Sequence, residues 1–271
     1  MKKLYTLGPK FSYSYNLSNQ VYDKDENCEV ICKTSIAEVF EYVNKNKDSI
    51  GIVPIENMIN GSVRETFVCL KKYKLKISKS YDFGIHHVLA SKSKDFKQIM
   101  SHPQAIAQSS DFLKKYRDNG IEILEVSSTS KAFELASQDE NIGAIGSYVG
   151  AVNYNLDILA ENIENNSNNV TRFIEIRNED FNNVNGVKTS MIIEPKVDRA
   201  GLLFEILSIF KIKDINLTKI ESLPTGEKIG EYIFYLDVEA NLSDKRLTDA
   251  ITFLETFVEI YLFGSYHVIK I

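Results

Sequence analysis

Short β-rich runs alternate with helical stretches along residues 1–165, and this alternation constrains the fold more than any other feature. Two of the intervening stretches, residues 35–43 and 107–116, place apolar side chains at helical spacing. The β-rich runs are residues 3–7, 29–33, 50–55, 121–126 and 142–145. Such alternation favours α/β layers around mostly parallel strands. Residues 77–91 form a longer extended run interrupted at Gly84, which predicts a crossing between two lobes.

The pattern changes after two asparagine-rich breaks, residues 164–169 and 178–185, which flank a strand-like run at 172–176. The residues beyond them read, in chain order, as strand, helix, strand, strand, helix and strand: 188–194, 202–212, 216–222, 232–238, 247–257 and 261–269. This βαββαβ order is the ferredoxin-like plan. The sequence therefore predicts two units, residues 1–180 and 186–271.

The charge balance excludes a main role on nucleic acid, which needs a basic surface. The chain has 32 basic and 37 acidic residues, for a net charge of −5. No apolar run approaches the ~18 residues of a membrane span, and no apolar stretch follows Lys2 and Lys3 as in a secretory signal. Three cysteines among 271 residues indicate reduced thiols rather than a disulfide framework. We expect a soluble, cytoplasmic protein with no membrane or nucleic-acid partner.

Four segments share one design, in which a strand ends, a short polar turn follows and a helix begins. They are Gly8–Ser14, Pro54–Ser62, Ser101–Gln104 and Ser127–Ser130. Ser35 with Glu38, and Ser62 with Glu65, also match the spacing of a helix capping box. Each serine could serve only as a cap worth ~1 kcal/mol to its own helix. Four helix starts facing one crevice instead favour a small anionic ligand, because they expose unpaired N–H groups and a partial positive charge.

Residues 169–173, Asn-Val-Thr-Arg-Phe, add a fixed cation beside a hydroxyl group. Arginine can bind a carboxylate with two parallel hydrogen bonds, while a neighbouring threonine can donate a hydrogen bond. The alternative is an exposed strand arginine beside a β-branched residue, which is common. The segment supports an anion-binding site only in combination with the four turns.

Metal and nucleophilic chemistry are poorly supported. Cys28 and Cys32 lack a third and a fourth ligand nearby, so zinc is not expected. His86 and His87 are adjacent in an extended run and point to opposite faces, which argues against a joint metal site. The standard phosphate-binding glycine loops and the serine-hydrolase elbow do not occur. His102 is the only histidine in a candidate turn, where it could titrate, although a histidine at that position is more often simply exposed.

Taken in order, these segments resemble the prephenate dehydratase family, and the resemblance covers nearly the whole chain. The matching motifs are Gly8–Ser14, Gly51–Asn57 with Gly61, Val63 and Thr66, Ser101–Gln108, Ser128-Thr129, Ala144-Ile145 with Ser147, and Thr171-Arg172-Phe173. The tail resembles an ACT domain, an amino-acid-sensing module, through residues 201–203 and 215–224. Six positions depart from the family pattern: Phe11 for glycine, Ser12 for threonine, Met58 for serine, Ser109 for cysteine, Ala200 for proline and Leu223 for arginine.

The resemblance implies a lyase that converts prephenate to phenylpyruvate, with loss of water and carbon dioxide and without a cofactor or metal. It implies that Thr171 assists departure of the hydroxyl group and that Arg172 orients the substrate, with Asn57 and Gln104 as further catalytic residues. The substrate-binding residues that it implies are Ser14, Glu56, Ser101 and Phe173. None of the six departures touches Asn57, Gln104, Thr171 or Arg172.

The resemblance also implies an α/β architecture with a two-lobed, periplasmic-binding-protein-like catalytic domain and a ferredoxin-like ACT regulatory domain. Lobe 1 would span about residues 1–76 plus 164–180, and lobe 2 about residues 77–163, because the Thr171-Arg172 strand would return to the first lobe. L-phenylalanine would act as feedback effector in L-phenylalanine biosynthesis, and the chain would form a homodimer or homotetramer. Its effector would bind at Gly201, Leu202, Leu203, Glu221, Ser222 and Pro224.

Three alternatives stay open at this stage. The substrate could be arogenate, the amino analogue of prephenate. The chain could be a non-catalytic amino-acid-binding sensor, since a two-lobed cleft is also how solute-binding proteins hold amino acids. It could also be an inactive paralogue, for which Phe11, Met58 and Leu223 are the grounds. Whether Leu223 abolishes the response to L-phenylalanine is likewise open.

Overall fold

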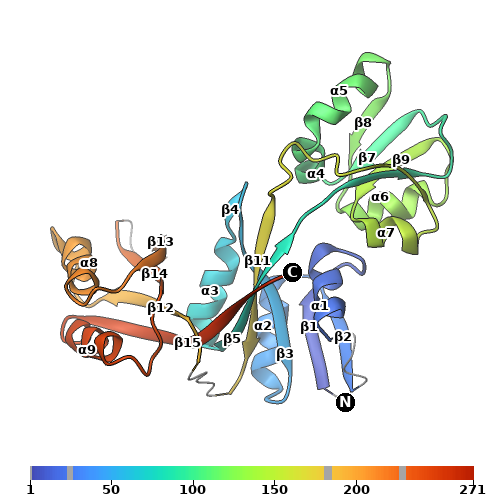
Figure 1. Cartoon of the computed structure of the whole chain (residues 1–271). Helices are drawn as coiled ribbons and strands as arrows, with labels where there is room; N and C mark the ends of the chain where they lie inside the picture. Colours follow the sequence, from blue (N-terminus) through green and yellow to red (C-terminus); the bar gives the residue numbers. More distant parts are fainter. Residues whose placement is uncertain (1, 23–26, 180–184, 226–229) are drawn as a thin grey trace.

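The computed structural model describes residues 2–22, 27–179, 185–225 and 230–271. They form three units in a row, with lobe 1 between lobe 2 and the C-terminal domain (Figure 1). Lobe 1 and the C-terminal domain share one ten-stranded sheet, and lobe 2 has a separate five-stranded sheet. None of the helices in these ranges combines the length and the apolar character needed to span a bilayer.

Lobe 1 consists of a mixed sheet covered by helices. Its strand order is β5 (Lys76–Gly84), β11 (Val170–Arg177), β3 (Ile50–Asn57), β1 (Lys2–Leu7) and β2 (Cys28–Lys33), and β4 (Gly61–Ser62) pairs with β3 as a short hairpin. Strand β1 is parallel to β2 and β3, whereas β11 is antiparallel to β3 and β5. The helices are α1 (Tyr13–Tyr22), α2 (Ile36–Lys45) and α3 (Arg64–Tyr73). The apolar side chains of α2 and α3 pack with the sheet in one core that includes Phe40 and Phe67.

Lobe 2 is an α/β layer of its own. Its strand order is β10 (Asp157–Glu161), β6 (Val88–Ser91), β9 (Ile142–Gly146), β7 (Gln98–Ser101) and β8 (Glu122–Glu125). Strands β7, β8 and β9 are parallel, as the alternating pattern predicted. The helices are α4 (Pro103–Gln108), α5 (Ser110–Asp118), α6 (Thr129–Ala136) and α7 (Tyr148–Asn153). Two separate apolar cores, one containing Phe133 and the other containing Phe96, hold these layers together.

The chain crosses between the lobes twice. Strand β5 belongs to the sheet of lobe 1 and ends at Gly84, and β6 begins at Val88 in the sheet of lobe 2, as the extended run with its glycine interruption predicted. The second crossing brings the chain back into lobe 1, where β11 lies between β3 and β5. The return of the Thr171-Arg172 strand to the first lobe is therefore confirmed.

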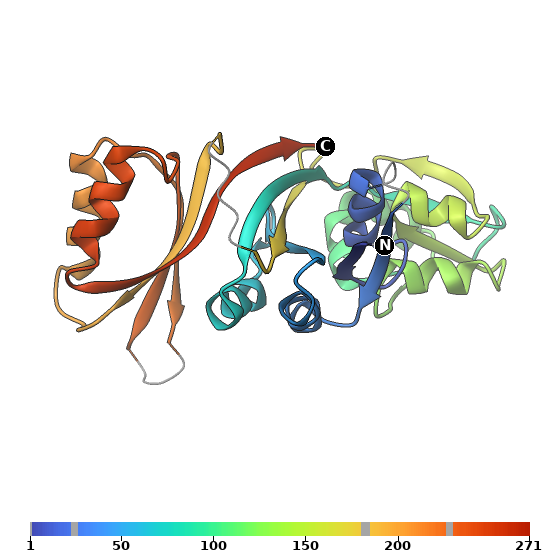
Figure 2. The ribbon, with the colours of Figure 1, turned by 90° about the horizontal axis from the view of Figure 1, so that it is seen from below.

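The C-terminal domain has the predicted βαββαβ order. Its elements are β12 (Lys188–Pro195), α8 (Leu202–Ile212), β13 (Leu217–Pro224), β14 (Tyr232–Val238), α9 (Lys245–Leu254) and β15 (Val258–Lys270). The strands pair antiparallel in the order β13-β14-β12-β15. Helices α8 and α9 cover the side of this sheet that faces away from lobe 1 (Figure 2). The other side packs onto lobe 1, where the ring of Tyr235 lies 4.6 Å from that of Phe67.

Strand β15 connects the two sheets. Its first part pairs with β12, and its last residues, His267–Lys270, pair parallel with Lys79–Asp82 of β5. Between the two parts lies Gly264, whose φ of +105° lies in a region that favours glycine. The sequence predicted a terminal strand at residues 261–269 but not its second partner. Figure 2 shows this strand running from the C-terminal domain across lobe 1.

Two local predictions differ from the structure. Ser35 caps α2 as expected, since its Oγ accepts from the Glu38 backbone N–H, but Ser62 caps nothing. Helix α3 begins at Arg64 after Val63, and the Ser62 hydroxyl instead donates to Glu221 of the C-terminal domain. Residues 107–116, expected to be helical together, divide between α4 and α5, because the backbone at Ser109 leaves the helical conformation.

Candidate active site

A cavity of about 410 Å³ lies between the two lobes. All four polar turns contribute to its wall, together with β11 from the return crossing. The lining residues that the sequence pointed to are Gly8, Ser12, Ser14, Pro54, Asn57, His102, Gln104, Ser127, Ser128, Thr129, Thr171 and Phe173. The convergence of helix starts on one crevice is therefore confirmed, because the carboxyl ends of the strands on both sides of the cleft face the same space.

The cavity lining offers an anion neutral polar groups. Among the described residues that line it there is no lysine and no arginine. The side chain of Ser128 accepts from the Lys131 N–H at the start of α6, and Ser12 accepts from the Tyr15 N–H at the start of α1. The remaining N–H groups of a first helical turn have no partner within the helix, and they carry the positive end of the helix dipole. Helix starts, amides and hydroxyls together suit a small anion.

Asn57 and Thr171 form the centre of the site. They are direct cross-strand partners of β3 and β11. The Oδ1 atom of Asn57 accepts from the backbone N–H groups of Ile59 and Asn60, at 3.1 and 3.0 Å. Because these donors can only meet an oxygen, the Nδ2 atom must point the other way, where it donates to Thr171 Oγ1 at 2.9 Å. The Thr171 proton is thereby left available to donate into the cavity.

A chain of amides continues from Asn57 across the cleft. Asn57 Nδ2 also donates to Asn169 Oδ1 at 2.9 Å, and Asn169 Nδ2 donates to Gln108 Oε1 at 3.2 Å. Each contact fixes the orientation of the next amide. Gln108 lines the cavity with only 7% of its surface exposed, and its Nε2 has no hydrogen-bond partner among the described residues. A buried donor without a partner costs free energy, and a bound oxygen anion would satisfy it.

His87, in the crossing between β5 and β6, contacts Gln108. Its Nε2 lies 2.9 Å from Gln108 Oε1, and its Nδ1 lies 2.7 Å from the hydroxyl of Tyr13. Because the carbonyl oxygen of Gln108 can only accept, His87 Nε2 must carry a proton. Burial lowers the pKa of the imidazole and outweighs the opposing effects of Gln108 and Glu164, so His87 is neutral near pH 7. Burial raises the pKa of Tyr13, which stays a phenol.

The adjacent His86 behaves differently. Its Nδ1 contacts Glu164 at 2.7 Å, and its side chain is half exposed. The two imidazoles therefore have different partners, although both residues lie between β5 and β6 rather than in a strand. Among the described residues, no group of three or more histidine, cysteine, aspartate or glutamate side chains is placed to hold a metal ion.

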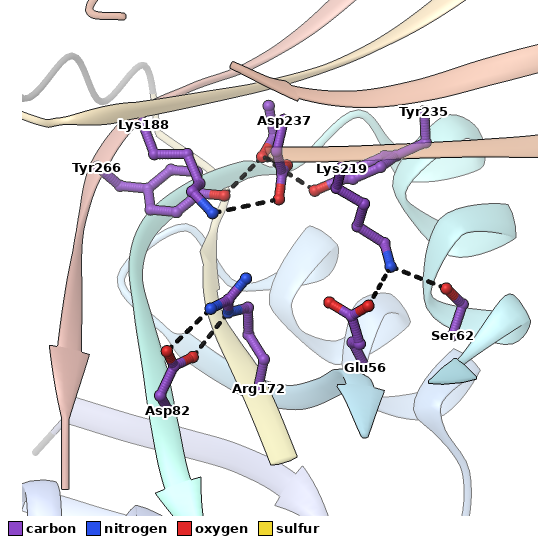
Figure 3. Close-up of polar contacts among 10 residues, drawn as sticks. Glu56, Ser62, Asp82, Arg172, Lys188, Lys219, Tyr235, Asp237 and Tyr266 are labelled. Atoms are coloured by element: carbon purple, nitrogen blue, oxygen red, sulfur yellow. Dashed lines mark hydrogen bonds and ion pairs between the residues drawn. The ribbon is translucent and has the colours of Figure 1, made fainter. Parts of the chain in front are cut away.

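Three of the expected site residues lie outside the cavity. Arg172 makes two hydrogen bonds to Asp82, of 2.7 and 2.8 Å, and Glu56 pairs with Lys219 at 2.6 Å (Figure 3). Both lie on the face of the sheet toward the C-terminal domain, because successive residues of a strand point to opposite faces and their neighbours Thr171 and Asn57 face the cleft. Ser101 is fully buried and donates to the Ile145 carbonyl. The structure therefore places these three side chains outside the cleft cavity.

Three other expected site residues line the cavity. Gln104 lies in the first turn of α4, exposed at the cavity, while Ser14 and Phe173 line it from lobe 1. Sequence reasoning missed Gln108 and His87 as site residues. Gln108 lies in the same motif as Ser101 and Gln104, but its burial and its unpaired nitrogen could not be read from the sequence. The one sequence feature that could have pointed to His87 as a site residue is its position in the run predicted to cross between the lobes.

The expected effector residues fall into two segments of the C-terminal domain. Gly201 precedes α8 with a φ of +82°, followed by buried Leu202 and half-buried Leu203. Glu221, Ser222 and Pro224 lie on β13, the edge strand of the ten-stranded sheet. Glu221 faces lobe 1 and accepts from Ser62, whereas its neighbours Ser222 and Pro224 are exposed.

Leu223, where the family pattern has arginine, is 3% exposed. It belongs to the apolar core that the C-terminal domain shares with lobe 1, together with Phe67 and Tyr235. The departure from the family pattern is therefore part of the packing between the two domains.

Comparisons with known proteins agree with this arrangement. Residues 4–181 match the family model described as prephenate dehydratase, and residues 196–256 match that of the ACT domain. The prephenate dehydratase of Methanocaldococcus jannaschii is 41% identical over 275 residues, which cover 98% of this chain and 97% of that protein. Arogenate dehydratase 2 of Petunia hybrida is 31% identical, over 96% of this chain and 69% of that protein.

A solved structure shares the whole architecture. The prephenate dehydratase of Arthrobacter aurescens, in complex with L-Phe, superposes with a TM-score of 0.86 at 27% identity, covering 98% of this chain and 90% of that one. The family model matches well over half of the 271 residues. The chain therefore belongs to the prephenate dehydratase family and carries an ACT domain after its two-lobed α/β part.

Proposed function

We propose that this chain is a prephenate dehydratase whose reaction takes place in the cleft cavity, with Thr171 assisting departure of the hydroxyl group. In the reaction, the bond between the ring and its carboxylate breaks, and its electron pair enters the ring. The ring carbon–oxygen bond breaks, and the departing hydroxide takes up a proton from solvent to become water. The products are carbon dioxide, water and phenylpyruvate, and formation of an aromatic ring drives the process.

The hydrogen bond from Asn57 to Thr171 carries this proposal. It occupies a lone pair of the Thr171 oxygen and leaves the hydroxyl proton directed away from Asn57. A threonine hydroxyl is too weak an acid to transfer its proton fully, so its role is to donate a hydrogen bond to the oxygen on which charge develops. A donor fixed in place before the reaction is the arrangement that this kind of catalysis needs.

The substrate is a dianion, and the cavity offers donors for both carboxylates. Gln108 Nε2 would bind a carboxylate oxygen and so obtain the partner that it lacks. Gln104 and Ser14 are further donors in the wall, and Phe173 supplies an apolar surface for the ring. Substrate binding at these residues is inferred from their position in the cavity.

Prephenate is favoured over arogenate by the charge of the lining. Arogenate carries an ammonium group where prephenate carries a ketone. Among the described residues that line the cavity there is no aspartate and no glutamate to pair with an ammonium group. An unpaired charge taken out of water is costly. A non-catalytic sensor is less favoured, because simple binding does not require a threonine held by an oriented amide.

L-phenylalanine is the proposed feedback effector, bound by the ACT domain near Gly201–Leu203 and residues 221–224. A relative of the same architecture was solved with L-Phe. We further propose a homodimer or homotetramer formed through the ACT domains. Strand β13 is a sheet edge, and Ile220 on it and Phe204 and Ile212 on α8 are exposed apolar residues. The cytoplasmic location expected from the sequence stays a prediction.

The test is phenylpyruvate formation from prephenate by the purified chain, with and without L-phenylalanine, and with arogenate as the second substrate. We expect turnover of prephenate that L-phenylalanine suppresses. Turnover of arogenate alone would replace the substrate assignment. A folded protein that converts neither compound would overturn the enzymatic function in favour of a sensor or an inactive paralogue. Turnover that is indifferent to L-phenylalanine would remove only the effector.

A further inference from the structure

The ACT domain holds the end of the strand that carries Asn57. Lys219 of β13 donates to Glu56 Oε1 at 2.6 Å and to Ser62 Oγ at 2.9 Å (Figure 3). Ser62 in turn donates to Glu221 Oε2 at 2.7 Å. Glu56 and Ser62 are paired residues of the β3–β4 hairpin, whose turn begins with Asn57. Two side chains of β13 thus contact both strands of this hairpin, directly beside the active site.

The Lys219 side chain is largely buried at this contact. Only 9% of the Lys219 side chain is exposed, and its ammonium nitrogen lies 5.9 Å from the centre of the Phe67 ring. The partner of Lys219 on the neighbouring strand β14 is Asp237. This carboxylate already accepts a hydrogen bond from Ser190 at 2.5 Å and forms an ion pair with Lys188 at 3.7 Å. Glu56 is therefore the carboxylate that Lys219 contacts directly. The Glu56 side chain is 33% exposed, so the ion pair is partly buried, and removing Lys219 would leave this carboxylate without its charged partner.

The pleat of the two central strands connects this contact to the cleft. Asn57 pairs with Thr171 and faces the cavity, while Glu56 pairs with Arg172 and faces the ACT domain. Neighbouring residues of one strand cannot move independently. A displacement of Glu56 therefore displaces Asn57 relative to Thr171, and the 2.9 Å hydrogen bond between them weakens steeply as it lengthens or bends.

We propose that Lys219, although it lies in the regulatory domain, is a positioning residue for the dehydration reaction. Through Glu56 it fixes the end of β3 so that Asn57 holds the Thr171 hydroxyl in its reactive orientation. The proposal rests on the dehydratase function proposed above. It also assigns a route for regulation, since Glu221, Ser222 and Pro224 lie on the same strand as Lys219 and a ligand bound there would act on the same contact.

A purely structural role is the alternative. In that case Lys219 would only hold the two domains together, and its loss would lower stability without a specific effect on turnover. The two roles are distinguished by separating kcat from KM, because loss of positioning acts on the chemical step whereas the substrate contacts of the cavity are unchanged.

The experiment compares Lys219→Met with Lys213→Met in the full chain. Lys213 is a matched control, since it lies in the same domain but pairs with Asp249 on the surface. We expect Lys219→Met to lower kcat at least tenfold with KM within about twofold, because small misplacements of reacting groups cost up to ~100-fold in rate. Lys213→Met should match wild type. Lys219→Arg, which keeps the ion pair, should recover part of the loss.

Glu56→Gln provides a second variant if Lys219→Met does not fold, and we expect the same loss of kcat. The double variant should lose no more than either single one, because both remove one interaction. With an active wild type, an unchanged kcat in folded Lys219→Met or Glu56→Gln overturns the positioning role alone. A wild type that converts neither prephenate nor arogenate overturns the dehydratase function as well.

Discussion

The amide nitrogen of Asn57 donates to the hydroxyl oxygen of Thr171 at 2.9 Å, across the antiparallel pair β3 and β11. The direction of this bond follows from the backbone, because two N–H groups of the β3–β4 turn occupy the Asn57 oxygen. The tight turn between β3 and β4 therefore determines the orientation of the Thr171 hydroxyl group. Gly61 closes this turn with a φ of +76°, a conformation that favours glycine.

Replacing Thr171 with valine keeps the shape of the side chain and removes the hydroxyl. We expect kcat for prephenate to fall at least ~100-fold with little change in KM, since the donor acts on charge that develops during the reaction. Thr171→Ser keeps the hydroxyl and should stay within about tenfold of wild type. Phenylpyruvate formation by folded variants is the measurement. Near-normal turnover by Thr171→Val would exclude the assigned role.

Asn57→Ala should lower kcat in the wild-type background but not when Thr171 is already valine. The amide acts through the Thr171 hydroxyl, and residues that act as a unit show strongly non-additive effects. Kinetics of the two single variants and the double variant complete the cycle. Additive losses would mean that Asn57 contacts substrate independently.

The two glutamines of α4 should differ in importance. Gln108 is buried with an unpaired Nε2 at the cavity, whereas Gln104 is exposed in the first turn. We expect Gln108→Leu to raise KM for prephenate at least tenfold, because a charged hydrogen bond is worth about 1.5–3 kcal/mol. Gln104→Leu should raise KM less. The reverse order would make Gln104, which the family resemblance names among the catalytic residues, the more important of the two.

Glu175 should make the folded state sensitive to acid. It is fully buried in lobe 1, where it accepts from Ser78, Tyr22 and Tyr81 and pairs with Arg177. Burial raises the pKa of its carboxyl, but the hydrogen bond from Ser78 and the charge of Arg177 outweigh burial, and the folded-state pKa lies below its usual range. Acidic solutions therefore protonate the unfolded chain first, which favours unfolding.

The stability that this carboxylate contributes is fully present above the ordinary glutamate pKa of about 4.3 and is lost as the pH falls through the lower folded value. We expect Glu175→Gln to be less stable than wild type at pH 7 and to lose less stability on acidification. Urea unfolding at a series of pH values measures both effects, with the exposed Glu140→Gln as control. The prediction would be contradicted if the free energy of unfolding fell equally steeply with pH in Glu175→Gln and in wild type below pH ~4.3.

The order of the C-terminal elements could be predicted from their periodicity, and so could five of the strands in residues 1–165. The regular alternation placed β1, β3 and β9, and the convergence of four helix starts followed from the geometry of parallel strands. The same strand periodicity also contained information that the sequence interpretation did not use. If Thr171 faces the cleft, its neighbour Arg172 must face away, so the alternation along the strand was a better guide to which side chains line the cavity than membership of the motif.

Other features depend on contacts that no local pattern encodes. Gln108 and His87 are 21 residues apart in sequence, and only the folded chain brings Gln108 Oε1 within 2.9 Å of His87 Nε2. The pairing of Ser62 with Glu221 likewise joins two domains, and it left α3 without the expected cap. In both cases the partner of a polar side chain comes from a distant part of the chain, so the local sequence could not predict it.

The last strand of the chain has a consequence for how such proteins can be rebuilt. Residues His267–Lys270 end the last strand of the C-terminal domain, yet they are the parallel partner of β5 in the sheet of lobe 1. Cutting the chain at the linker near residue 185 would strip β5 of a neighbour and leave a row of backbone donors and acceptors open to another chain. The C-terminal domain therefore cannot be exchanged without also replacing a strand of the lobe 1 sheet. A chimeric protein with a different C-terminal domain would need another strand in the place of β15 to keep the lobe 1 sheet intact.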